Sequence, residues 1–533
     1  MLRNLYCKNA NNAISLRIDA GAIMKITIVL LLFFNVQASA NGHVPPIEIK
    51  GQVVDKQGNP LEGVSVSITG TLKGTTTNSD GRFALNIPEG LNNIVLEVSN
   101  IGFTSKTVTV GNQTEIKITL EEAKAGLDQV VVVGYGRQSK RNITSSIGSV
   151  SSKDIGDYPV QQIGQALQGK ITNVQIVQQS GAPGSSMMIR IRGTRTVNNS
   201  EPLYVIDGNL GADPNDLDPN SIASIEVLKS ASAAAIYGSQ GANGVVMITT
   251  KKGISGAPSL QIDYSKGFQQ VHRTMPVMNA KQFATIYNQA LTNGGRSPLF
   301  ADVESLGEGT NWQNEMFRTA PIQNVGFSVS GGGKQGTYYI SADYFTQKGI
   351  VINTDYSRLN FRLNSEYKIN PAITFGENLS LSYAVRNDIP EFGGRDPVAN
   401  SWHMDPTTPV KNPDGTWGFP KFSDTKNPVA EATFYNNTIK RPALNASAYF
   451  DIKPLNNLVY RSQINVNLGF SNGYQFTPTF DIYPLQRNLT NSVGRVDAQW
   501  TNWDWQNTIT YKIVEGSHTL EILGGTTILS NHS

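Results

Sequence analysis

The strongest constraint on the fold is a set of long segments after residue 259 in which apolar and polar side chains alternate. Between Arg358 and Ile369, apolar side chains occupy alternate positions and charged or amide side chains occupy those between them. Similar patterns run from Ile373 to Val385 and from Leu458 to Phe470. A period of two predicts β-strands. These exceed the common soluble strand of about 5–6 residues and reach the ~9–11 residues that cross an outer membrane.

Each of these strands has one apolar face, which suits lipid. The opposite face, with side chains such as Arg362, Gln463 and Asn465, is too polar for a packed core, and we expect it to border water inside a wide barrel. Aromatic residues typical of a membrane interface lie near strand ends: Tyr338, Tyr339, Tyr344 and Phe345. A soluble antiparallel sheet with one hydrated face gives the same alternation and is the alternative.

The N-terminus has the three regions of a secretory signal. Met24-Lys25 precedes the apolar run 26–36 and the small residues Ala38-Ser39-Ala40, so we expect a signal peptide at 24–40 and cleavage after Ala40. Residues 1–23 are then an upstream extension. The run is shorter than the ~20 residues that a membrane-spanning helix needs, and no later segment is apolar enough for one.

Charge and cysteine content exclude several classes of function. Residues 1–40 contain four of the 44 basic residues and one of the 41 acidic ones, so 40 of each remain. A neutral chain without a concentrated basic face is not expected to bind nucleic acid. The single cysteine, Cys7, excludes a disulfide framework, a thiolate metal site and a thiol enzyme.

Residues 47–122 alternate short β-branched runs with tight-turn residues such as Asp80-Gly81. This pattern predicts a small antiparallel β-sandwich without a catalytic cluster of His, Asp or Glu. Four valines, Val130 to Val133, follow between Asp128 and Gly134 and form a strong strand signal. The segment is either the last sandwich strand or, at a domain boundary, a strand that pairs with another protein; we favour the second.

Residues 143–252 have the mixed pattern of a compact α/β domain. Helices are expected at 161–167 and 231–237, and strands at 174–178, 187–192, 203–207, 222–228 and 245–250. The glycine-rich stretch 238–244 lacks the Gly-Lys-Ser/Thr ending of a phosphate-binding loop and precedes a strand, so we interpret it as a turn.

Several motifs, taken in order, make the chain similar to TonB-dependent outer-membrane transporters of the SusC/RagA type. They are Asp80-Gly81-Arg82-Phe83, Val130 to Gly136, Ala166 to Lys170, Ile189 to Gly193, Pro202 to Gly208 and Ser232 to Gly238. The resemblance implies a mainly β protein. Its parts are a carboxypeptidase-regulatory-like sandwich (47–122), a TonB box and linker (127–142), an α/β plug domain (143–252) and a transmembrane β-barrel (259–533).

The resemblance also implies a function and partners. The chain would import oligosaccharides or peptides across the outer membrane of a Gram-negative bacterium, with its N-terminal domain in the periplasm and a SusD-type surface lipoprotein as a lid. TonB would bind the box formed by Asp128, Gln129, Val130, Val131, Val132, Val133, Gly134 and Tyr135. Neither an enzyme activity nor a cofactor or metal is expected. The alternative is a ligand-binding receptor that acts mainly in signalling or adhesion.

Two aromatic residues and three departures from the family complete the sequence predictions. Trp402 and Trp417 lie in a long loop, where they either stack on a substrate or pack locally. Charged residues of the family are replaced by Gln129, Ser230 and Gln240, so charge pairing of the plug at the last two is in doubt. About nine strands are expected after residue 259, whereas such barrels close with about 22. We therefore expect an incomplete barrel, as in the N-terminal part of a longer transporter.

Overall fold

The computed structural model divides into two compact units, Met1–Leu127 and Asp128–Ser533, each described here by itself. The described residues are 47–68, 73–87, 95–100, 103, 106–110, 113, 115–121, 130–133, 136–139, 146–155, 161–194, 196, 200–390, 396–516 and 518–532. The predicted extension and signal peptide, 1–40, lie outside them. Among the described residues, no helix is long and apolar enough to cross a membrane.

The first unit contains two small sheets. One has the order β4 (Arg82–Ile87), β1 (Ile47–Val54), β7 (Glu115–Thr119), and the other β3 (Gly74–Thr76), β2 (Ser65–Ile68), β5 (Val95–Ser99), β6 (Lys106–Thr109). Their apolar side chains, among them Val53, Val66 and Leu96, form one buried core. The predicted sandwich is confirmed, but it is not purely antiparallel, because β1 and β7 run parallel.

The second unit begins with a β-hairpin. Strand β8 (Val130–Val133) pairs antiparallel with β9 (Gly136–Ser139), so that Val133 faces Gly136. The strand expected at Val130 to Val133 is thus present, and it is not a strand of the sandwich sheets. Its partner β9 was not predicted; a connection of two residues suffices to fold the chain back on itself.

The plug, as we call residues 146–252, has a central sheet and a separate two-stranded sheet. The central sheet has the order β10 (Ile147–Ser151), β15 (Ile222–Leu228), β16 (Val245–Thr250), β13 (Leu203–Ile206), β14 (Asn209–Leu210), and β11 (Val174–Gln178) pairs with β12 (Met187–Ile191). The helices are α2 (Ser152–Ile155), α3 (Ile163–Leu167), α4 (Ala231–Ala234), η2 (Pro214–Asp216), η3 (Pro219–Ser221) and η4 (Ala235–Gly241). The five predicted strands agree with the structure to within one residue, but β10, α2, β14, η2 and η3 were not predicted. Part of the stretch 238–244, which we interpreted as a turn, belongs to η4.

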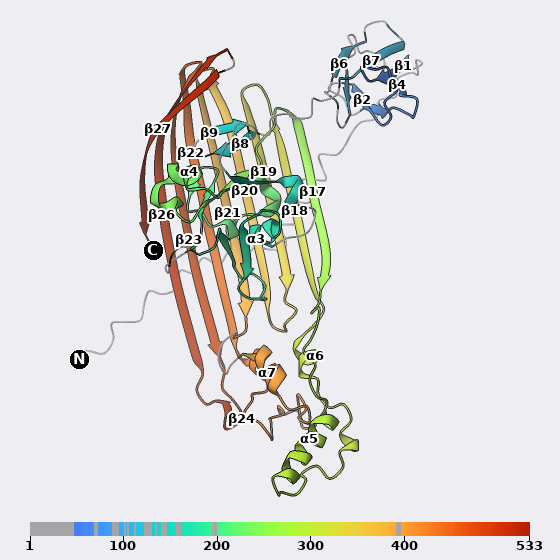
Figure 1. Ribbon diagram of the computed structural model, residues 1–533, viewed down its shortest axis with the longest axis vertical. Coiled ribbons are helices and arrows are strands. Elements are labelled where there is room, and N and C mark those ends of the chain that lie inside the picture. The colour runs from blue at the N-terminus through green and yellow to red at the C-terminus, as the bar shows by residue number, and fades with distance from the viewer. Residues whose placement is uncertain are drawn as a thin grey trace, which may run out of the picture. The chain divides into compact units, whose positions relative to one another are not determined.

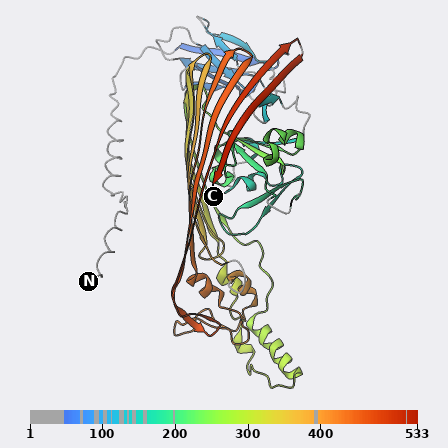
Figure 2. The same ribbon diagram turned by 90° about the vertical axis from the view of Figure 1, so that its left-hand side faces the viewer.

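In the part of the chain that the structure describes, nine long antiparallel strands form one large sheet, which we call the wall. In chain and spatial order they are β17 (Gly256–Gln269), β18 (Ala320–Gly332), β19 (Gly336–Lys348), β20 (Asp355–Asn370), β21 (Ile373–Asp388), β22 (Asn436–Leu455), β23 (Leu458–Thr477), β26 (Ser492–Glu515) and β27 (His518–His532). Strands β17 and β27 are its two edges. The plug lies against one face of the wall (Figures 1 and 2). The expected count of nine strands and an open sheet is confirmed.

The two ends of the wall strands differ. At one end the strands join through short turns such as Pro371-Ala372, and at the other through long segments that carry further elements (Figure 1). These are α5 (Ala280–Asn293), η5 (Glu304–Leu306), α6 (Trp312–Met316), α7 (Pro397–His403), α8 (Pro428–Phe434), β24 (Phe480–Tyr483) and β25 (Gln486–Asn488). Short turns at one end and long loops at the other are typical of outer-membrane barrels.

The two faces of the wall have the polarity that the alternation predicts. Leu359, Phe361 and Ile464 are exposed on the face away from the plug, where Trp503 and Trp505 also lie. The sequence analysis expected the polar face to border water, and that expectation was wrong. Most of it is buried against the plug, with Arg358 at 1% and Asn465 at 0% exposure. Tyr339 and Phe345 are also buried on the wall's inner face, so their assignment to a membrane interface was wrong.

Candidate functional site: the seat of the plug on the wall

A two-residue turn of the plug makes several buried polar contacts with the wall. Strands β13 and β14 form a hairpin, in which Ile206 faces Asn209 and the turn is Asp207-Gly208. Both turn residues have positive φ, 50° and 86°, as a type I′ turn requires. We call residues 203–210 the anchor hairpin. Asp and Gly at this turn allow the backbone to fold back sharply, which projects the turn toward the wall.

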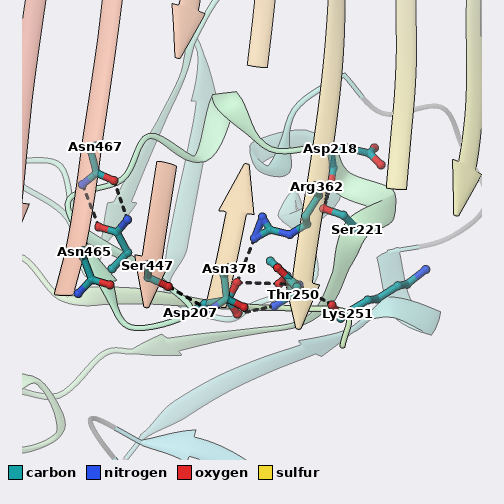
Figure 3. A network of polar contacts seen from close by, with 12 residues as sticks. Asp207, Asp218, Ser221, Thr250, Lys251, Arg362, Asn378, Ser447, Asn465 and Asn467 are labelled. Atoms are coloured by element: carbon teal, nitrogen blue, oxygen red, sulfur yellow. Dashed lines mark hydrogen bonds and ion pairs between the residues drawn. The ribbon is translucent and has the colours of Figure 1, made fainter. Parts of the chain in front are cut away.

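Asp207 forms a buried ion pair with the wall (Figure 3). Its Oδ2 accepts a hydrogen bond from Arg362 Nη2 of β20 at 3.0 Å and another from Thr250 Oγ1 at 2.6 Å. Its Oδ1 accepts from the Thr250 amide at 3.0 Å. The two charged side chains are 5% and 6% exposed. Asp207 thus joins the hairpin, strand β16 of the plug and the wall in one contact.

A row of amide side chains on β23 holds the rest of the turn. Gln463 Nε2 donates to Asp207 O at 3.1 Å and Asn465 Nδ2 to Gly208 O at 3.4 Å. Asn467 and Asn209 exchange two hydrogen bonds, of 2.7 and 2.9 Å. These side chains share one face of the strand because they are two residues apart.

The next wall strand, β26, adds an acid and another amide to this seat. Gln506 Nε2 donates to Gly208 O at 2.8 Å, and Asp504 Oδ1 accepts from the Leu210 amide at 3.4 Å. Asp504 Oδ2 in turn accepts from Asn465 at 2.7 Å. Buried polar groups of this kind stabilise a single arrangement when their hydrogen bonds are made, and they are costly to separate.

A second plug segment, 212–218, contacts the wall through its backbone and one acid. Arg358 donates to Asn215 O and Asn360 to Asp216 O, at 3.0 and 2.7 Å. Asp213 accepts a hydrogen bond from Arg441 Nη2 at 2.9 Å. Burial and the neighbouring Asp213 raise the pKa of Asp216 to about 7.

The plug residues that precede the anchor hairpin contact the wall differently. Arg358 donates to Gln161 O at 3.0 Å and Arg386 to Gly184 O at 3.4 Å. Both acceptors are backbone carbonyls in loops, so no charged side chain of the plug takes part in these two contacts. The stronger attachment of the plug therefore lies between residues 203 and 251, where Asn364 also holds Thr250 and Lys251 O.

The residues predicted to bind TonB and substrate lie in separate parts of the structure. Val130 to Val133 form β8, while Asp128, Gln129, Gly134 and Tyr135 lie outside the described residues. Trp402 is 41% exposed on α7. Trp417 packs locally: the Lys411 Nζ lies 4.7 Å from its ring centroid, and the Phe434 ring lies 5.8 Å away. The two tryptophans thus lie on different elements of the loop region.

The residues that seat the plug were quoted in the sequence analysis without this role. Pro202 to Gly208 appeared as a motif, and Arg362, Gln463 and Asn465 as a water-facing row. Ser230, which replaces a charged family residue, caps α4 by accepting a hydrogen bond from the Ala233 amide at 3.2 Å. Among the described residues, no group of three or more His, Cys, Asp or Glu side chains is placed to hold a metal ion.

Replacing Gly208 with alanine should loosen the plug. A Cβ at Gly208 would lie 2.8 Å from Gln463 Nε2, and the φ of +86° already disfavours any L side chain by about 1–2 kcal/mol. Gly211→Ala is the matched control, because its φ is +71° and an added Cβ would have nothing within 4 Å. We expect trypsin to cut the plug at a lower temperature in Gly208→Ala than in Gly211→Ala. Equal temperatures would show that Gln463 does not restrain the turn.

Comparisons with known proteins agree with this architecture. The model of a CarboxypepD_reg-like domain matches residues 49–132, and that of a TonB-dependent receptor plug domain matches residues 139–245. The chain is 33% identical over 497 residues to TonB-dependent receptor P3 of Formosa agariphila, covering 90% of this chain and 47% of the relative. It is 31% identical over 444 residues to TonB-dependent receptor SusC of Bacteroides thetaiotaomicron, covering 77% and 43%.

A solved structure has the same fold over a similar fraction of each chain. The RagAB peptide importer in its open-open state superposes with a TM-score of 0.67 at 25% identity, covering 76% of this chain and 49% of that one. This chain thus spans about half the length of the curated relatives it matches. None of the proteins named here is described as an adhesin or a signalling protein, so that alternative is not favoured.

Proposed function

The chain belongs to the SusC type of TonB-dependent receptors, and on this premise we propose that it serves TonB-energised import across the outer membrane. The observation that carries the proposal is a plug seated by its anchor hairpin on the polar face of a long-stranded sheet. Such a plug closes a lumen and must move before a solute can pass. The opposite, apolar face of the wall suits lipid.

The proposed route of energy is mechanical. TonB adds a strand to the segment Asp128 to Tyr135, of which Val130 to Val133 form β8, and pulls on it from the periplasm. Hydrogen bonds along a strand pair resist force together, so a short strand is sufficient for TonB to bind and pull on the chain. Since β8 precedes β10 in the chain, the force reaches the plug at its N-terminal side. No step requires a nucleophile, an acid or a base.

The substrate and the lid partner are also proposals. We propose oligosaccharides or peptides as substrate and a SusD-type surface lipoprotein as partner. RagAB is described as a peptide importer, and SusC gives this type of receptor its name. Trp402 and Trp417, in the segments at the long-loop end of the wall, are the proposed aromatic contacts with substrate. The partial exposure of Trp402 supports this role better than the local packing of Trp417.

The test is genetic. Deleting the gene from its chromosome should abolish uptake of one class of labelled oligosaccharide or peptide, and complementation should restore it. In cells without TonB, uptake of the same substrate should be equally low, and deleting the gene should then cause no further loss. Uptake that needs this gene but persists without TonB would contradict the proposal.

A further inference from the structure

Two ion pairs join the plug to the wall among the described residues, and they differ in access to water. The pair of Asp207 with Arg362 is buried, and both oxygens of its carboxylate accept other hydrogen bonds. The side chains of Asp213 and Arg441 are 29% and 34% exposed, and their ion pair is a single contact of 2.9 Å between Asp213 Oδ2 and Arg441 Nη2. An exposed pair contributes little stability, whereas opening a buried one is costly. Only the second can exchange partners easily.

Arg441 is held in place by groups other than Asp213. Its guanidinium carbon lies 5.3 Å from the ring centroid of Trp500 on β26. Trp500 faces Gly469 of β23. A Cβ at that glycine would lie 2.0 Å from the indole, so only glycine leaves room for the ring in this position. The stacked guanidinium stays oriented by the ring when a carboxylate partner leaves.

Asp213 has a second attachment that also survives the exchange. Its Oδ1 accepts a hydrogen bond from the Asn215 amide at 2.9 Å and caps η2, while Oδ2 contacts Arg441. The loop conformation therefore does not depend on the ion pair. Releasing Arg441 frees one contact between the plug and the wall without unfolding the segment.

A cavity of about 540 Å³ lies beside Trp500, between the plug and strands β26 and β27. Amide side chains line it, among them Gln240, Asn243 and Asn502, together with the carboxylates of Glu201 and Asp504. Amides suit a neutral polar ligand, and the carboxylates of Glu201 and Asp504 disfavour any negative charge within the cavity itself. Arg441 does not line the cavity, but it stacks on Trp500, which does. A ligand with a neutral or cationic body in the cavity could therefore place one carboxylate beside Trp500, at Arg441.

We propose that Arg441 binds the carboxylate of a transported ligand and that Asp213 is its internal competitor. The inference rests on the proposed function, because it assigns a specificity residue within the same lumen. Ligand binding exchanges the partner of Arg441 and removes the accessible ion pair between plug and wall, while the buried pair of Asp207 persists. The ligand carboxylate can belong to a peptide C-terminus or to an acidic sugar.

Equilibrium binding to the receptor purified from outer membranes tests the proposal. The probes are trialanine and lactobionate, each with one carboxylate, and the controls are trialanine amide and lactose. At least one carboxylate probe should bind more tightly than its control without the carboxylate, which identifies the source of the carboxylate. If neither acid exceeds its control, the proposal is wrong.

Variants of the two partners should change this affinity in opposite directions. Asp213→Asn retains the helix cap but removes the competing charge, so the affinity should rise about two- to fivefold. Arg441→Gln removes the charge-assisted hydrogen bonds, and the affinity should fall at least about tenfold. If the ion pair is purely structural, both variants should bind the carboxylate probe with the affinity of the unmodified receptor or with a lower one. A lower affinity in Asp213→Asn would therefore overturn the proposal even if Arg441→Gln fails to fold. TonB is absent from this assay, so its outcome is independent of the import test.

Discussion

Proline at Val132 should reduce energised uptake to the level of cells without TonB, while substrate binding at the cell surface stays close to normal. Residues beside a two-residue connection form a hydrogen-bonded pair, and such pairs alternate along a hairpin. Val133 pairs with Gly136 and Val131 with Gln138, so the amides of Val131 and Val133 point toward β9. The amides of Val130 and Val132 then point to the free edge, where an added strand would bind.

Val131→Pro is the matched control for this substitution. It replaces the same residue type and also removes one donor, but from the edge already paired with β9. If TonB adds to the free edge, uptake should be reduced more by Val132→Pro than by Val131→Pro. The reverse order would mean that TonB displaces β9. Normal uptake in both variants, measured with labelled substrate in chromosomal mutants, would place the TonB contact outside β8.

The predictability of the wall from sequence follows from the physics of strands. A period of two assigns every residue of a strand to one face, and a slip of one residue would reverse both faces. Leu359 and Phe361 are exposed on the outer face and Arg358 and Asn360 are buried on the inner one, as the alternation requires. The polarity of each face could therefore be derived without any knowledge of the neighbouring strands.

What covers the polar face could not be derived in the same way. Alternation reports that Arg362, Gln463 and Asn465 are polar, but water and a polar partner satisfy such side chains equally well. The partner is the turn Asp207-Gly208, which lies about 150–260 residues away along the chain. Nothing local to either segment encodes that pairing. A signal was nevertheless present: an arginine within an amide-rich row favours a carboxylate partner, and Asp207 is the acid in the motif Pro202 to Gly208.

The hairpin of β8 shows a limit of a different kind. Four valines predict a strand, but the pattern contains no information about which edge is paired. Gly136 to Ser139 has no β-branched residue and gave no strand signal, yet it forms β9. Register and backbone hydrogen bonds, rather than side-chain propensity, place it there.

Breaking the buried ion pair should release the plug. Arg362→Met keeps much of the side-chain volume but leaves the Asp207 carboxylate 6% exposed and without its counter-charge. Removing one partner of a buried pair costs about 3–5 kcal/mol, because the remaining charge cannot be hydrated. We expect trypsin to cut the plug rapidly in isolated outer membranes, and vancomycin, which is too large for an occupied lumen, to become toxic.

The double variant Arg362→Met with Asp207→Asn separates the lost charge pair from lost packing. Asparagine retains an acceptor for Thr250 but carries no charge, so most of the protease resistance should return. Lys348→Met is the control, since Lys348 pairs with Asp355 between two wall strands, both partners are partly exposed, and little loss is expected. If Arg362→Met behaves like Lys348→Met, the pair does not hold the plug. Rapid cleavage in Arg362→Met with full recovery in the double variant would assign the protease resistance of the plug to this one buried contact.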